Sequence, residues 1–396
     1  MEKILNFWIG IILFANLYYF GPLFGLASNA ILFTVATICV FFFVFRYDRS
    51  FQKLLFSQLS FRIIILSLVF GGLQIFSGYE VRPNDLFRIS IYTLYFGWTF
   101  FLFKNRERLR LYLKRQLGFL LVIIVIMAIF EFLFYDQFHS ILDSEFFTDR
   151  ANKRLTVSFL DPNFFAFALI SFAYIFNKLE KSISLILAVA LGTIILVNLT
   201  GSRLGLLLSL VLMLQSLNIF LKNHSRWKYT SLATICLGSV FFQGLRTGDL
   251  DTATILERIS GGEKTQMASA SANARMESMK DGIKALDLSQ LVLPPGNLFF
   301  RSKWATDGRG RHYPHSTFLF LFVEYGAYVI WPFLILAGLY KKSKIAKLRQ
   351  IYIFLLLGFL FLPNLLYYST TYLIFFFIET APRSSSNNKN NVIIKT

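Results

Sequence analysis

Long apolar stretches, separated by short polar turns, recur along the chain and predict a series of membrane-crossing helices. A bilayer core of about 30 Å needs roughly 20 apolar residues per helix, and stretches approaching that length occur repeatedly. The predicted fold class is therefore all-α and polytopic, with about a dozen transmembrane helices. The predicted spans are residues 4–20, 26–45, 63–77, 86–103, 117–135, 159–176, 183–199, 204–221, 229–245, 316–340, 351–362 and 365–378.

One long polar segment interrupts this pattern and divides the chain. Residues 1–245 are predicted to hold the first nine spans, and residues 246–312 form one large loop. Within that loop, residues 272–286 show helical periodicity and predict an amphipathic helix lying over the membrane surface. Residues 313–380 then hold the last three spans, and residues 381–396 form a polar tail that we expect to be disordered.

Composition agrees with a membrane protein. Of the 396 residues, 55% are hydrophobic and only 16% are charged, whereas soluble domains keep about a quarter of their residues charged. The net charge of +18 raises the question of nucleic acid, but its distribution argues against that partner. Lysine and arginine concentrate in short loops between apolar stretches, as the positive-inside rule describes.

Three of these basic loops set the predicted orientation. They lie at residues 46–62, 104–115 and 341–349, and counting spans puts all three on one side, which is then the cytoplasm. Both ends of the chain are expected on that side. The large loop at residues 246–312 is expected on the outer side, together with the turns at residues 136–158 and 198–203.

Three outer turns are each predicted to open a helix. They contain Asp161-Pro162-Asn163, Thr200-Gly201-Ser202-Arg203 and His315-Ser316-Thr317. A helix start presents unpaired N–H groups and the positive end of the helix dipole, which favours anions, and Arg203 adds bidentate phosphate geometry. Two structural alternatives stay open: Asp161 as a simple helix cap, and Arg203 as an arginine that snorkels to the interface.

Histidines and further arginines lie close to the third of these helix starts. His312 and His315 form an H-x-x-H pair beside Arg311, but the spacing is not that of a zinc-binding helix, so acid–base or phosphate chemistry is favoured over a metal. Arg275, in the predicted amphipathic helix, is within reach of the same region, although alone it would be an ordinary solvated charge. No phosphate loop, dinucleotide fingerprint or nucleophile elbow occurs.

Two carboxylates fall inside predicted spans. Glu324 and Glu131 should be neutral or paired at that depth. For both, a structural hydrogen bond to a neighbouring helix and a catalytic role are open interpretations.

Several of these segments, taken in order, resemble the O-antigen polymerase and O-antigen ligase superfamily. Residues 199–207 (LTGSRLGLL) resemble its TGSRxGLL signature, and residues 159–166 (FLDPNFFA) resemble the F-x-DPN segment of the polymerases. HSTFL at residues 315–319, with EYG at residues 324–326, resembles HNxxLxxxxExG, although Ser316 replaces the usual asparagine. Arg275 resembles the arginine of the family's loop helix. The resemblance covers about residues 60 to 380.

The resemblance implies a metal-independent, inverting glycosyltransferase with a glycosyltransferase C-like fold, at the periplasmic face of the bacterial inner membrane. It implies no cofactor. Arg203 and Arg275 would bind the donor pyrophosphate, and His315 would activate the acceptor hydroxyl or help to bind the donor. The supporting candidates are Asp161, Asn163, Ser202, Arg311, His312 and Glu324. The implied partners are a polyprenyl-pyrophosphate-linked oligosaccharide donor and acceptor and membrane lipid, with a chain-length regulator as a further candidate.

Three functions remain open at this stage. The first is an O-antigen or exopolysaccharide polymerase that joins lipid-linked repeat units. The second is an O-antigen ligase that transfers the glycan to the lipid A core, and the Asp161-Pro162-Asn163 segment favours the polymerase over it. The third is a lipid-linked glycan flippase or other transporter, which would be expected to show related halves with broken helices, and no such repeat is visible.

Overall fold

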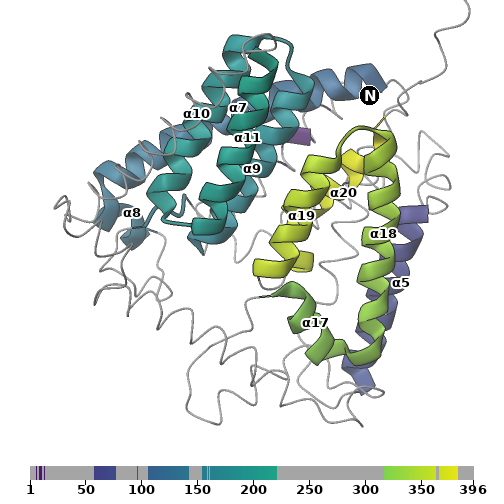
Figure 1. Ribbon diagram of the computed structural model, residues 1–396. Coiled ribbons are helices and arrows are strands. Elements are labelled where there is room, and N and C mark those ends of the chain that lie inside the picture. The colour runs from purple at the N-terminus through teal and green to yellow at the C-terminus, as the bar shows by residue number, and fades with distance from the viewer. Residues whose placement is uncertain are drawn as a thin grey trace, which may run out of the picture.

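The computed structural model describes residues 58–76, 106–141, 154–157, 161–220, 316–362 and 365–381, together with the isolated positions 6, 9, 10, 13, 96 and 159. Within these ranges every regular element is helical (Figure 1). The helices are α5 (Gln58–Phe76), α7 (Arg106–Leu133), α8 (Tyr135–Ile141), α9 (Pro162–Leu179), α10 (Ile183–Thr200), α11 (Arg203–Phe220), α17 (Thr317–Tyr325), η2 (Gly326–Val329), α18 (Ile330–Ile345), α19 (Arg349–Phe361), η3 (Leu365–Tyr367) and α20 (Ser369–Thr380).

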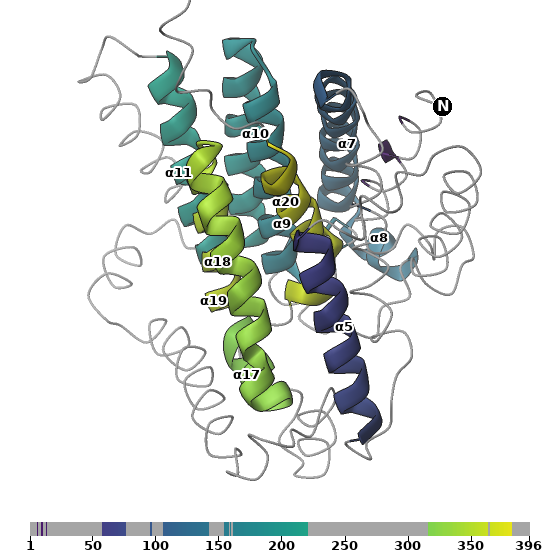
Figure 2. The same cartoon turned by 90° about the vertical axis from the view of Figure 1, so that its right-hand side faces the viewer.

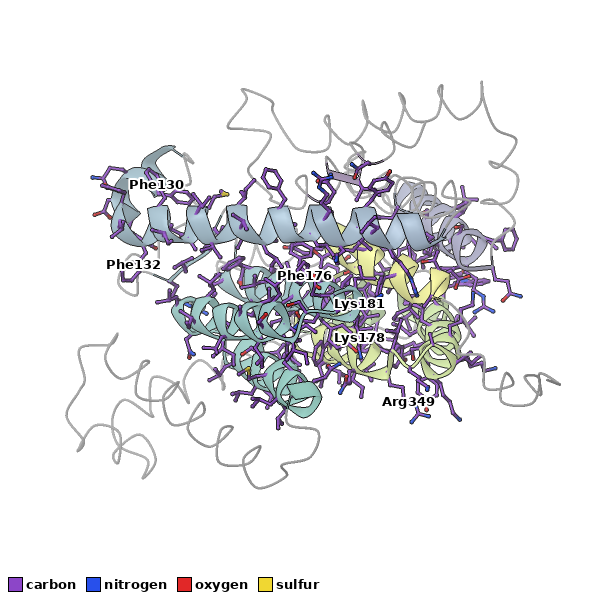
Figure 3. All side chains as sticks on the ribbon, turned by 90° about the horizontal axis from the view of Figure 1, so that it is seen from above. Phe130, Phe132, Phe176, Lys178, Lys181 and Arg349 are labelled. Carbon is purple, nitrogen blue, oxygen red and sulfur yellow. The ribbon has the colours of Figure 1, made fainter. Side chains whose placement is uncertain are left out.

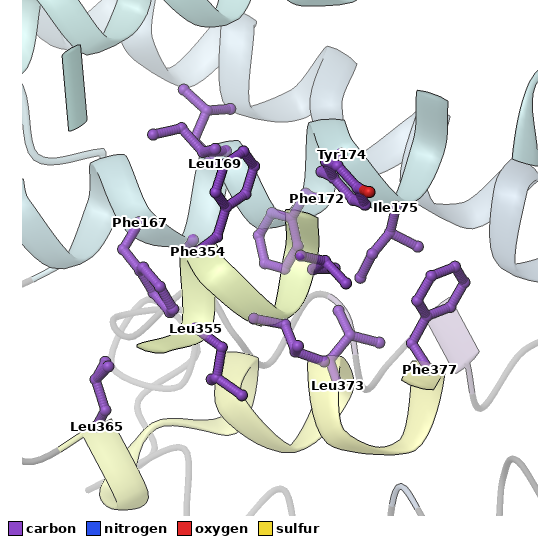
Figure 4. Close-up of a cluster of buried hydrophobic side chains, with 14 of the residues drawn as sticks. Phe167, Leu169, Phe172, Tyr174, Ile175, Phe354, Leu355, Leu365, Leu373 and Phe377 are labelled. Atoms are coloured by element: carbon purple, nitrogen blue, oxygen red, sulfur yellow. The ribbon is translucent and has the colours of Figure 1, made fainter. Parts of the chain in front are cut away.

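Helix α9 is the central element of the described bundle. Every residue from Phe164 to Asn177 is buried, and α9 contacts α7, α10, α11, α19 and α20. A helix that is apolar on all sides is either surrounded by other helices or in contact with lipid, and α9 is surrounded by other helices. Figure 4 shows one part of this packing, where side chains of α9 meet Phe354 of α19 and Leu373 of α20.

Two of the described helices are long and apolar enough to cross a bilayer, namely Leu109–Leu133 within α7 and the whole of α10. Helix α7 lies along one edge of the bundle and exposes large apolar side chains, Phe130 and Phe132 among them (Figure 3). An exposed apolar surface of this kind suits lipid better than water. The length and apolar composition of these two helices thus indicate membrane association. The total of about a dozen spans remains a prediction from the sequence.

Several predicted spans correspond closely to described helices. The spans at residues 63–77, 159–176, 183–199 and 204–221 match α5, α9, α10 and α11 within a few residues, and the span at 117–135 is the apolar part of the longer α7. The spans at residues 4–20, 26–45, 86–103 and 229–245 lie outside the described ranges apart from a few isolated positions, as does the large loop at residues 246–312.

Basic side chains gather at one end of the bundle, which we call the basic end. There Lys114 of α7 pairs with Glu180 just after α9 over 3.3 Å, and Lys342 of α18 pairs with Glu379 of α20. Lys178 and Lys181 lie at or just after the end of α9, and Arg349 begins α19, whose Gln350 accepts a hydrogen bond from the α9 residue Tyr174 (these basic residues are labelled in Figure 3). Lys114 and residues 341–349, which the sequence puts in loops on one side, therefore lie at the same end of the described helices.

The predicted span at residues 316–340 is not a single helix. Helix α17 ends at Tyr325, η2 follows, and α18 begins at Ile330. The rings of Phe318 and Phe333 stack with centroids 4.8 Å apart, whereas 15 residues of continuous helix would separate them by about 22 Å. The chain therefore reverses between α17 and α18 (Figures 1 and 2).

The reversal has a local cause at Gly326. This residue adopts φ 54° and ψ −132°, a conformation that side chains with a Cβ strongly disfavour. The chain can thus leave the helical path after Tyr325, whose ring stacks on Phe70 of α5 with centroids 3.6 Å apart. The apolar pattern of residues 316–340 runs through this break, which is why it predicted one span.

Candidate functional site

The first candidate helix start belongs to α9. Asp161 is its N-cap in an extended conformation, and its Oδ1 atom accepts a hydrogen bond from the Asn163 N–H over 2.6 Å. Pro162 occupies the first turn, where the missing N–H costs nothing. The predicted cap is confirmed. Asp161 and Asn163 are both partly exposed, so their side chains border the surface at this end of α9.

The second helix start lies in the turn between α10 and α11. Helix α10 ends at Thr200, and Gly201 takes the left-handed conformation with φ 65° that closes many helices. Ser202 is buried, and its hydroxyl accepts the Gly205 N–H over 3.1 Å, so it caps α11. Arg203 is the first residue of α11, but its side chain lies outside what the structure describes.

The third helix start belongs to α17. Ser316 is its N-cap, and its hydroxyl accepts from the Leu319 N–H over 3.5 Å. The fully buried Thr317 hydroxyl donates to the Leu362 carbonyl oxygen over 2.5 Å and accepts from the Leu365 N–H over 3.1 Å. These bonds attach the start of α17 to the end of α19 and to η3.

Contacts bring the three starts to one end of the bundle, opposite the basic end, which we call the motif end. Near the start of α9, the Phe164 ring stacks on Tyr368, one residue after η3, with centroids 4.0 Å apart. In the second turn of α9, Ala166 packs against Gly205 of α11. The Leu365 N–H of η3 donates to the Thr317 hydroxyl at the start of α17. Contacts therefore connect the start of α9 with the starts of both α11 and α17.

One part of the predicted arrangement is wrong in the structure. The sequence predicts that all three helices run from the motif end toward the basic end. Helices α9 and α11 do so, but α17 runs the other way, because the reversal at Gly326 lets α18 make the return. The start of α17 therefore points in the direction opposite to the starts of α9 and α11.

The remaining predicted residues are placed only in part. His315, His312, Arg311 and Arg275 lie outside the described residues. Glu324 is buried at the end of α17, two residues before Gly326, and so lies at the tip of a helical hairpin rather than deep in a continuous span. In the described ranges, no group of three or more His, Cys, Asp and Glu side chains is arranged to hold a metal ion.

A short segment before α9 adds two side chains to this region. The Arg154 Nε atom donates to the Thr200 carbonyl oxygen over 2.7 Å, at the end of α10. Glu131, fully buried near the end of α7, accepts hydrogen bonds from Thr156 and Val157. Arg154 was not among the residues that the sequence pointed to, and for Glu131 a hydrogen bond to a neighbouring helix and a catalytic role were both open. No local spacing signals either contact, because the partners are 25 to 46 residues apart.

No known protein-family model matches the chain, and no curated protein or solved structure matches it at a significant level. What the described residues define is an all-helical protein with two candidate membrane-crossing helices and a region where three helix starts meet.

Proposed function

We propose that this protein is a multi-spanning glycosyltransferase of the bacterial inner membrane that polymerises polyprenyl-pyrophosphate-linked glycan repeat units at the periplasmic face. The observation that carries the proposal is the meeting of three helix starts at the motif end, because each bears one of the three segments that resemble the polymerase signatures. These segments are separated by more than 30 residues in the sequence, and a polymerase site needs them together.

Charge distribution supports the proposed orientation. The basic end carries Lys114, Lys178, Lys342 and Arg349, and basic loops of membrane proteins face the cytoplasm. The motif end then faces the periplasm, where lipid-linked repeat units are joined in the family that this sequence resembles.

The chemistry proposed at the motif end is one substitution at an anomeric carbon. The acceptor hydroxyl oxygen forms a bond to that carbon while the bond from the carbon to the donor pyrophosphate oxygen breaks, and attack opposite the leaving group inverts the centre. His315 takes the hydroxyl proton, and the lipid pyrophosphate leaves with the electron pair. Arg203, Arg275 and the start of α11 stabilise the charge that develops on it.

Complementation of a deletion strain tests the proposal, with silver-stained polysaccharide ladders as the readout. Loss of the wild-type gene should leave a single repeat unit on the lipid core, and His315→Ala or Arg203→Ala should fail to restore the ladder. Arg203→Lys keeps the charge but not the bidentate geometry, so it should restore the ladder only in part. Arg349→Ala, an exposed residue of the basic end, is the matched control and should restore it fully.

Other outcomes assign the protein differently. A deletion strain that attaches no repeat unit at all to the core indicates a ligase. An unchanged ladder in the deletion strain overturns the polymerase, and a full ladder with His315→Ala removes that residue from the mechanism. Transport of lipid-linked glycan by vesicles that contain this protein and no acceptor indicates a flippase.

A further inference from the structure

We propose that Glu131 is a positioning residue for the motif end: by holding residues 154–157, it orients the turn that begins α11 and the segment that leads into α9. The inference rests on the proposed function only for its effect on catalysis. The positioning itself rests on hydrogen bonds of the described residues.

Several hydrogen bonds join the Glu131 carboxyl group to one short segment. Its Oε1 atom accepts the Thr156 N–H over 2.9 Å and the Thr156 hydroxyl over 3.0 Å, and its Oε2 atom accepts the Val157 N–H over 2.6 Å. Glu131 is fully buried, and so are Thr156 and Val157. Hydrogen bonds are stronger where water is excluded.

The backbone of this segment is shaped around the carboxylate. The backbone N–H groups of Thr156 and Val157, neighbours in the chain, both donate to the same carboxyl group. In an extended strand, successive N–H groups point to opposite sides and could not do this. Val157 takes φ 46°, an unfavourable value for a β-branched residue. Strain of this kind persists where surrounding contacts over-determine it. Here the Glu131 carboxylate supplies those contacts.

The other half of the segment holds the end of α10. The Leu155 N–H donates to the Leu199 carbonyl oxygen over 3.1 Å, and Arg154 donates to the Thr200 carbonyl oxygen. Both acceptors lie in the last turn of α10, where carbonyl groups lack helical partners and a cation favours the dipole. Arg203 follows Thr200 by three residues.

A continuous chain of contacts thus runs from α7 to the second helix start. Glu131 holds Thr156 and Val157, these carry Arg154 and Leu155, and the last two bind the turn before Arg203. Asp161, the cap of α9, follows Val157 by four residues. One carboxyl group on α7 is therefore linked to the turn that begins α11, and the segment that it holds lies four residues before the cap of α9.

Glu131→Gln is the informative substitution because it keeps the shape. An amide has one acceptor oxygen, and its NH₂ group would face an N–H or O–H donor of residues 156 and 157. The matched control is Thr193→Val, which removes a buried hydroxyl bond to Val189 within α10 and touches none of these contacts. Arg154→Ala removes the contact at the other end of this series, the hydrogen bond to the Thr200 carbonyl oxygen.

Hydrogen–deuterium exchange of the full-length protein in nanodiscs tests the positioning without any substrate. Glu131→Gln should speed exchange of the amides of residues 154–157 and 200–206 by roughly tenfold or more, and leave residues 178–186 at the basic end unchanged. Thr193→Val should leave residues 154–157 unchanged. Unaltered protection of residues 200–206 in Glu131→Gln overturns the inference, even if the protein proves to have another function.

A polymerisation assay with purified lipid-linked repeat units tests the consequence. Per folded molecule, Glu131→Gln should lower kcat about tenfold or more with little change in KM, since the contacts it disturbs matter when charge develops on the leaving group. Combined with Arg154→Ala, the loss should be smaller than the product of the two single losses. Multiplicative losses, or an unchanged kcat, contradict the inference. An inactive wild type contradicts the proposed function alone.

Discussion

The Cβ atom of Ala166 lies only 2.7 Å from where a Cβ atom on Gly205 would stand. Helices α9 and α11 therefore pack closely near their starts, where Ala166 lies in the second turn of α9 and Gly205 in the first turn of α11. Small residues allow such close approach between helices in membranes. Gly205, the second glycine of the LTGSRLGLL segment, thus has a packing role in addition to any role near a ligand.

Gly205→Ala should weaken the protein, because the Ala166 Cβ atom is fixed to its backbone and the two helices would have to separate. We expect a loss of about 1–3 kcal/mol in the free energy of unfolding, measured as a lower melting temperature in detergent. Gly192→Ala is the control: no atom lies within 4 Å of its added Cβ, and alanine favours a helix by about 1 kcal/mol. Equal melting temperatures for the two variants would contradict this packing.

Thr317→Val should detach the start of α17. The substitution keeps the shape but leaves the buried Leu362 carbonyl and Leu365 N–H without their partner, at about 1–3 kcal/mol for each group left unsatisfied. We expect a lower melting temperature and a shortened polysaccharide ladder. Thr317→Ser keeps the hydroxyl and should retain most of both, so a serine variant as impaired as the valine one would refute the role of these bonds.

Gly326→Ala should disturb the reversal between α17 and α18. Its φ of 54° with ψ of −132° is costly for alanine, by about 1–3 kcal/mol. The control is Gly72→Ala in α5, where an added Cβ meets no atom within 4 Å. Cysteine cross-linking between positions 318 and 333 checks the hairpin directly. Efficient linking is expected in a Phe318→Cys, Phe333→Cys variant, and its absence would indicate the continuous helix that the sequence predicted.

Glu180 should contribute stability that is lost in acid. The pKa of its carboxyl lies below the usual value of 4.5, chiefly because it accepts the Ser182 N–H, and further because of the Lys181 N–H and the Lys114 ammonium group. A carboxyl with a lowered folded-state pKa stabilises the protein above its unfolded pKa and ceases to do so as pH falls through the folded value.

The measurement for Glu180 compares melting temperatures of the wild type and Glu180→Gln from about pH 7 down to about pH 3.5. The variant should melt lower at neutral pH, and the two melting temperatures should converge as the pH falls below 4.5 and the wild-type carboxyl becomes protonated. A difference that stays constant over this range would mean that ionisation of Glu180 does not contribute.

Local sequence signals predicted helix ends well where the residues that start or stop the helix are neighbours in the chain. Asp161 and Pro162 mark the start of α9, and Gly201 marks the end of α10, because capping and left-handed turns involve neighbours in the chain. Gly326 carried a comparable signal, but a glycine inside an apolar stretch is also common in membrane helices, so the break was missed.

The sequence by itself determined the all-helical class, the placement of most described helices and the gathering of basic residues in a few loops, since apolar length, caps and charge act over a few residues. Only the tertiary structure decided that α17 turns back, that Thr317 is held by Leu362 and Leu365, and that Glu131 holds the segment before α9. These contacts join residues 15 to 48 positions apart, and their geometry depends on how neighbouring helices pack rather than on any local pattern.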